Sequence, residues 1–177
     1  MCNRLPRGLY AAWAAAMLSC LSLAMPATAA EAPPLLSCKM SAPAKLRAGA
    51  AVPLTFELGN RGKKALYVLN WNTPLEGFFG RYLNVTGPQG ELEYGGAMVK
   101  RAQPQREEYV ILPPGGKVAK TVNLASVYEF KAAGSYRIEF TGRIADATTG
   151  KIPRAFEQQT AAEIDCAAVT IEITSGR

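Results

Sequence analysis

Short runs in which apolar and polar residues alternate recur along most of the chain. Alternation with a period of two is typical of β-strands that bury one face. Clusters of Gly and Pro, such as residues 87–90 and 113–116, separate the runs and favour tight turns. The expected strands are residues 35–41, 52–58, 64–69, 82–86, 91–94, 109–112, 118–124, 135–140 and 163–173.

This number of short strands predicts an all-β fold, namely an immunoglobulin-like β-sandwich of seven to nine strands. Gly134 and Tyr136 support the prediction, because a Gly-x-Tyr at the start of a late strand resembles the tyrosine corner. In that motif the tyrosine hydroxyl bonds to the backbone of the preceding crossover. Between the strands we expect one helical turn at residues 126–130 and a long polar loop at residues 146–160.

Residues 1–30 have the features of a secretory signal peptide. Two arginines form a basic start, an apolar stretch follows, and Ala27-Thr28-Ala29 offers a cleavage site. A lipoprotein signal at Met17-Leu18-Ser19-Cys20 is the alternative, although Cys20 lies inside the apolar stretch. We therefore expect residues 31–177 to form one exported domain, periplasmic or secreted, without a membrane span.

The formal net charge of +6 is mild, and loss of the signal peptide would remove two arginines and no acidic residue. The remaining basic residues are scattered, with Lys63-Lys64 and Lys100-Arg101 as the only adjacent pairs. No nucleic-acid-binding motif accompanies them, so a nucleic acid is not an expected partner.

Cys38 and Cys166 are the two cysteines that would remain after the signal peptide is removed. An even pair in an exported protein favours a disulfide bond. Such a bond would connect the first expected strand to the last. Two buried free thiols are the alternative.

The stretch from Ala65 to Arg101 contains the best candidate for a binding site. Two expected strands flank a loop in which apolar and aromatic residues occur where turn residues should dominate. Such a loop either folds back as a lid on the core or presents an apolar surface to a partner. The candidate binding residues are Trp71, Pro74, Leu75, Phe78, Phe79, Lys100 and Arg101.

The chain contains no histidine, which removes the Ser-His-Asp triad, the Cys-His pair and the HExxH zinc motif. Two carboxylate pairs occur, Glu91/Glu93 on an expected hairpin and Glu107-Glu108 in an expected loop, and neither has the setting of a catalytic dyad. We therefore expect a protein that is not an enzyme and that binds no metal and no cofactor. An enzyme that uses only carboxylates or a hydroxyl group is the remaining alternative.

Several motifs between Leu46 and Thr141 follow one another in a characteristic order. They are Asn72-Thr73-Pro74-Leu75-Glu76-Gly77, Leu83-Asn84-Val85-Thr86, Tyr94-Gly95-Gly96, Val99-Lys100-Arg101, Glu108-Tyr109-Val110, residues 112–115, Val122-Asn123-Leu124, Tyr128, Gly134, Tyr136 and Ile138. This order resembles the deuterolysin and peptidyl-Lys metalloendopeptidase family, and within it the β-rich amino-terminal precursor segment. Proteases of that family carry an HExxH helix and an aspartate ligand in a following zinc domain, whereas this sequence has no histidine. The resemblance therefore implies a precursor domain without its zinc catalytic domain.

In that family the precursor segment accompanies folding and keeps the zymogen inactive. The resemblance thus implies a monomeric inhibitor or chaperone-like partner of an exported zinc metalloprotease. In the lysine-specific branch of the family the specificity pocket accepts a basic side chain, so the resemblance makes Lys100 a candidate substrate mimic. A different hypothesis is an envelope, adhesion or carbohydrate-binding module, in which an exposed Trp71 could stack on a sugar.

Overall fold

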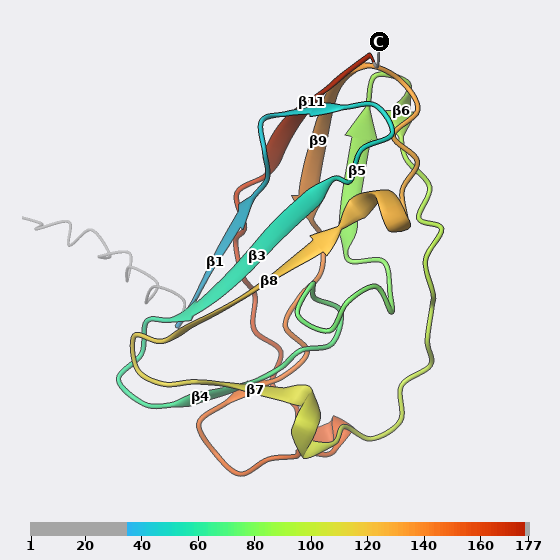
Figure 1. Ribbon diagram of the computed structural model, residues 1–177. Helices are drawn as coiled ribbons and strands as arrows, with labels where there is room; N and C mark the ends of the chain where they lie inside the picture. The colour runs from blue at the N-terminus through green and yellow to red at the C-terminus, as the bar shows by residue number, and fades with distance from the viewer. Residues whose placement is uncertain (1–34, 176–177) are drawn as a thin grey trace, which may run out of the picture. The chain divides into compact units, whose positions relative to one another are not determined.

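The computed structural model describes residues 35–175, which form strands and short 3-10 helices but no α-helix (Figure 1). The strands are β1 (Leu36–Ser41), β2 (Lys45–Arg47), β3 (Pro53–Asn60), β4 (Leu66–Leu69), β5 (Leu83–Gly87), β6 (Gly90–Glu91), β7 (Tyr109–Leu112), β8 (Lys117–Asn123), β9 (Gly134–Phe140), β10 (Ala147–Thr148) and β11 (Val169–Thr174). The 3-10 helices are η1 (Arg106–Glu108), η2 (Leu124–Ser126) and η3 (Phe156–Gln158). The predicted signal peptide and the alternative lipoprotein site at Cys20 lie outside the described residues.

Two sheets face each other in the main part of the fold. One has the strand order β1-β3-β8 and the other the order β2-β11-β9-β5-β6, in which β2 runs parallel to β11. If β1, β3 and β8 are taken as strands A, B and E, and β5, β9 and β11 as strands C, F and G, their neighbours are those of the immunoglobulin sandwich. Eight of the described strands have four residues or more. The predicted immunoglobulin-like β-sandwich of seven to nine strands is therefore confirmed.

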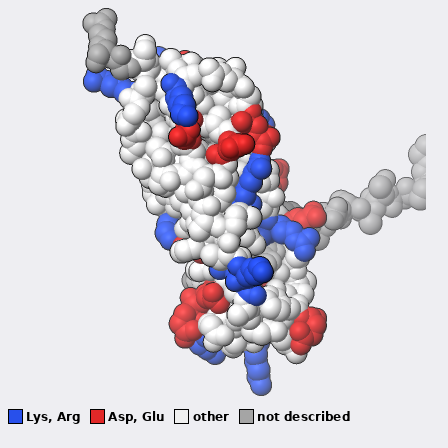
Figure 2. All heavy atoms as spheres, turned by 90° about the vertical axis from the view of Figure 1, so that its right-hand side faces the viewer, with Lys and Arg blue, Asp and Glu red and all other residues white. Residues whose placement is uncertain are grey.

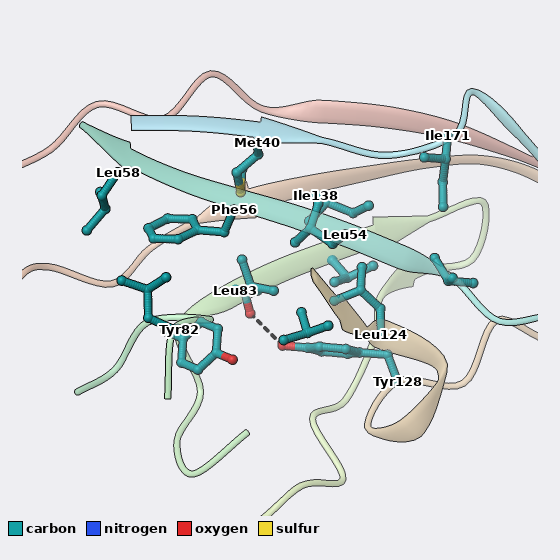
Figure 3. Packing of buried hydrophobic residues seen from close by; sticks show 14 of the residues in the cluster. Met40, Leu54, Phe56, Leu58, Tyr82, Leu83, Leu124, Tyr128, Ile138 and Ile171 are labelled. Atoms are coloured by element: carbon teal, nitrogen blue, oxygen red, sulfur yellow. Dashed lines mark hydrogen bonds between the residues drawn. The ribbon is translucent and has the colours of Figure 1, made fainter. Parts of the chain in front are cut away.

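The hydrophobic core lies between these two sheets (Figure 3). Along β3 every second side chain is fully buried, as the alternating sequence pattern requires. Phe56 of β3 packs across the core on Phe140 of β9, with ring centroids 5.3 Å apart. The Tyr128 hydroxyl donates to the carbonyl oxygen of Leu83 at 2.8 Å, so this buried polar group is satisfied (Figure 3).

A small third sheet, with the order β10-β4-β7, supports a second hydrophobic cluster. The buried members of this cluster are Leu69, Trp71, Tyr109 and Ile152. The chain leaves β4 at Leu69 and enters the loop that contains most of the candidate binding residues. The second cluster therefore fixes the start of that loop.

The segment at residues 146–160, predicted to be a long polar loop, is held by a fully buried carboxylate. Asp146 accepts hydrogen bonds from the Tyr109 hydroxyl at 2.9 Å, from Nη1 of Arg154 at 2.9 Å and from the Thr160 amide at 2.8 Å. Burial, together with the hydrogen bond to Asp146, raises the pKa of Tyr109 to about 12. The segment is therefore not a polar loop throughout. Its first residue, Asp146, is buried, and its next two residues form β10.

Cys38 and Cys166 form the predicted disulfide, with their Cα atoms 4.9 Å apart. Cys166 precedes β11, so the bond fixes the approach to the last strand and does not lie within it. Tyr136 donates its hydroxyl to the carbonyl oxygen of Ala132 at 2.7 Å. This bond is the tyrosine corner that the sequence predicts.

Near the edges of the larger sheet one strand prediction is wrong in extent and one strand is missed. Of the second arm of the predicted hairpin, 91–94, only Glu91 belongs to a strand, although the Leu92 amide still donates to the Val85 carbonyl oxygen at 2.8 Å. Beyond it, Tyr94 packs on Tyr128 with ring centroids 5.7 Å apart. Strand β2 was not predicted, since three residues with one apolar member give too short a pattern. The parallel neighbour β11 supplies its hydrogen bonds.

Two further boundaries are shifted. The predicted helical turn at 126–130 lies at 124–126, because the Asn123 side chain caps it by accepting the Ala125 amide at 3.2 Å. The predicted last strand at 163–173 begins only at Val169. Residues 163–168 alternate in burial but belong to none of the described strands.

Candidate functional site

The loop between β4 and β5 turns sharply just after the buried end of β4. Asn72 has a φ of 53° and Gly77 a φ of 108°, in the region that favours glycine. The buried Thr73 closes the turn, because its hydroxyl donates to the Asn70 carbonyl oxygen at 2.6 Å and accepts the Leu75 amide at 3.2 Å. At the far end of the loop the Tyr82 hydroxyl donates to the Gly77 carbonyl oxygen at 2.8 Å. The loop is therefore held internally.

Most of the apolar candidates in this loop fold onto the core. Trp71, Pro74 and Leu75 are buried. Phe78 is half-buried and stacks on Tyr82, with centroids 6.1 Å apart and an interplanar angle of 6°. The lid interpretation thus accounts for these four side chains. Phe79 differs, since 46% of its surface is exposed.

The connection from residue 92 to residue 105, here called the strap, runs along one side of the domain between β6 and η1 (Figure 1). It is attached by backbone hydrogen bonds from Gly95 to the Val127 carbonyl at 2.8 Å and from Val99 to the Phe79 carbonyl at 3.3 Å. Near its end, the Gln103 side-chain oxygen accepts the amide of Phe156 at 3.2 Å. The strap thereby brings Lys100 and Arg101 beside a loop about twenty residues earlier in the sequence.

Arg101 joins the strap to the loop. Its Nη2 donates to both carboxylate oxygens of Glu76, at 2.7 and 2.6 Å, and its guanidinium lies 5.0 Å from the centroid of the Trp71 ring. The Glu76 carboxylate also accepts the Asn72 amide at 2.6 Å. Burial raises the pKa of Glu76, and this effect outweighs the opposing effects of Asn72 and Arg101. Trp71 is fixed from another side by a 2.8 Å hydrogen bond from its Nε1 to Glu108.

Between the loop and the strap lies a cleft of about 580 Å³. Five of the candidate binding residues line it, namely Trp71, Leu75, Phe79, Lys100 and Arg101. Pro74 and Phe78 do not line it and instead support the loop from the core side. The residues of the lining that the sequence did not single out are Asn70, Glu76, Val99, Ala102, Gln103, Gln105 and Glu108.

Another cleft of the same volume lies between residues 92–95 and 125–129, but none of the candidate binding residues lines it. The cleft between loop and strap is distinguished by exposed apolar side chains. Of the six large hydrophobic side chains that are exposed among residues 35–175, Phe79 and Val99 line this cleft. Met98 precedes Val99, and Phe156 contacts Trp71 with ring centroids 6.1 Å apart. This gathering marks the cleft as a candidate interaction surface.

Figure 2 shows the side of the domain along which the strap runs in Figure 1. Basic and acidic side chains are interspersed on this face, with a broad uncharged surface between them (Figure 2). A face that binds a polyanion would require a large area of positive charge, and no such area is visible there.

Asn70 lines the cleft, and its side-chain oxygen is buried without a hydrogen-bond partner among the described residues. Across residues 35–175 no cluster of three or more Cys, Asp or Glu side chains is placed to hold a metal ion. Within the same residues no helix is long and apolar enough to cross a membrane.

No known protein-family profile matches the chain. A stretch of 90 residues, 50% of the chain, is 29% identical to part of an extracellular protease of Aeromonas hydrophila. The chain spans only 25% of the length of that protease. The similarity therefore relates half of this chain to one portion of a larger protein.

Among solved structures, the CARDB domain of the PF1109 protein from Pyrococcus furiosus, in complex with di-metal ions, aligns with 80% of this chain and 89% of its own, at 12% identity and a TM-score of 0.33. A mutant β-glucosidase from Listeria innocua, in complex with laminaribiose, aligns with 81% of this chain and 16% of its own, at 10% identity and a TM-score of 0.35. TM-scores this low do not establish a shared fold. The fold assignment therefore depends on the strand order.

Proposed function

We propose that this protein is an exported, non-catalytic binding domain that inhibits a deuterolysin-like metalloprotease or assists its folding. The observation that carries the proposal is the cleft between loop and strap, with exposed Phe79 and Val99 on a pre-formed frame. A surface that is rigid before binding loses little conformational entropy when it docks.

Two further observations support the choice of partner. The similarity to an extracellular protease covers half of this chain and only a quarter of the protease, which is the relation expected for an accessory portion of such an enzyme. The motif order around residues 72–77 and 99–101 resembles the precursor segment of the deuterolysin family. The same relation, together with the Cys38–Cys166 disulfide, supports export to an oxidising compartment.

A non-catalytic role fits the side-chain chemistry of the chain. There is no histidine in the sequence, and the two cysteines of the described residues are bonded to each other. The carboxylates in the cleft are engaged structurally, since Glu76 binds Arg101 and Glu108 binds Trp71. A sugar-binding role through Trp71 lacks support, because only 4% of this residue is exposed.

The test is a titration of the folded protein against a purified deuterolysin-like metalloprotease, with hydrolysis of a chromogenic peptide as the readout. We expect saturable inhibition at micromolar concentration or below. Phe79→Ala should weaken the inhibition at least tenfold, because truncating a hot-spot side chain at the centre of an interface costs about 2 kcal/mol or more.

The matched control is Ile111→Ala, which removes an even more exposed apolar side chain from β7, outside the lining of the cleft. This variant should inhibit as the wild type does. A wild type that neither binds nor slows the protease would exclude the proposed function and favour the envelope or adhesion module. Equal effects of the two variants would leave the function standing but place the contact elsewhere.

A further inference from the structure

We propose that residues 97–101 of the strap, named here the presenting segment, enter the substrate cleft of the partner protease as an extended strand. This inference rests on the proposed function and specifies the part of the surface that makes the contact. It assigns direct contact to the side chains of Met98 and Lys100 and a positioning role to Arg101.

The backbone of the presenting segment is largely unpaired. Among the described residues, 98–101 have a single backbone hydrogen bond, which the Val99 amide donates to the Phe79 carbonyl at 3.3 Å. Backbone groups left free in this way can pair with the backbone of a partner.

Both ends of the presenting segment are fixed to the domain. At the start, the Tyr94 hydroxyl donates to the Ala97 carbonyl oxygen at 3.1 Å. At the end, Arg101 binds the Glu76 carboxylate and lies over the Trp71 ring. The segment is thus fixed at two attachment points while its backbone groups stay free to pair. This limits the conformational entropy that it loses on binding.

The side chains of the presenting segment define the partner's chemistry. Met98 is 73% exposed, so its side chain can enter an apolar pocket of the partner. Lys100 is also exposed and forms no ion pair among residues 35–175. A largely unpaired backbone that carries an exposed apolar side chain and a free ammonium group fits a peptide-binding cleft that has an apolar wall and a negatively charged pocket.

The experiment measures the inhibition constant of the folded protein at several concentrations of the peptide substrate. We expect competitive inhibition, because the presenting segment and the substrate would occupy the same cleft. Lys100→Ala should raise the inhibition constant at least tenfold, and Met98→Ala should raise it several-fold. The matched control is Lys63→Ala, which removes an exposed lysine from the turn after β3. It should leave the constant unchanged.

The outcomes separate this inference from the proposed function. Non-competitive inhibition, or equal constants for Lys100→Ala and Lys63→Ala, would overturn the role of the presenting segment while leaving an inhibitor. Absence of binding by the wild type would overturn both. The urea midpoint of each variant is measured as well. If it equals the wild-type midpoint, any loss of inhibition comes from the lost contact and not from unfolding.

Discussion

Removal of the disulfide between Cys38 and Cys166 should destabilise the domain without changing its fold. The bond joins residues 128 positions apart in the sequence. Closing a loop of that length removes conformational entropy from the unfolded chain worth about 5 kcal/mol at 25 °C. We expect the double variant Cys38→Ala, Cys166→Ala to lose about 2–5 kcal/mol, the range observed for small disulfide-bonded domains. A loss of this size is a large part of the stability of a typical domain.

The assay is urea unfolding followed by the fluorescence of Trp71, the one tryptophan in residues 31–177. The wild type in reductant should unfold at the same urea concentration as the double variant in buffer. The dependence of the unfolding free energy on urea should become steeper, because an unfolded chain without the cross-link exposes more surface. Coincident midpoints for oxidised and reduced wild type would refute the assigned stabilisation.

Two further substitutions test the core and the cleft. Tyr128→Phe should cost about 1–2 kcal/mol in urea unfolding, because the buried Leu83 carbonyl oxygen loses the hydroxyl that donates to it. Because burial raises the pKa of Glu76, the folded state holds the proton of this residue more tightly than the unfolded state does. The wild type should therefore be most stable relative to Glu76→Gln in acid and lose this advantage as the pH rises through the folded-state pKa. A relative gain with rising pH would mean that attraction to Arg101 outweighs burial.

The strands that face the core could be predicted from the sequence because burial on one side imposes a strict alternation. In β3 each buried apolar residue is followed by a less buried neighbour over most of its length. Residues 163–168 alternate equally well but form no described strand, because alternation specifies a half-buried extended chain and not its hydrogen-bonding partner. The disulfide at Cys166 holds this segment to β1 instead.

The candidate site could be predicted only in part. The loop at residues 71–79 was detectable because aromatic residues occupied turn positions. The sequence does not show that Trp71 is buried and Phe79 exposed, because Trp71 packs with Tyr109 and Ile152, which lie far along the chain. The sequence does not indicate that Glu76 and Glu108 belong to the site. Their hydrogen-bond partners, Arg101 and Trp71, lie 25 and 37 residues away in the sequence.

The central claim is that the protein binds a metalloprotease through the loop and strap around this cleft. The most direct measurement is amide hydrogen exchange, read by mass spectrometry, of the domain alone and in a saturated mixture with the protease. The account predicts slower exchange in residues 71–81 and 97–105 on addition of the protease, with little change in the hairpin turn at 113–116. Slower exchange confined to other segments, or none in a mixture that still shows inhibition, would contradict it.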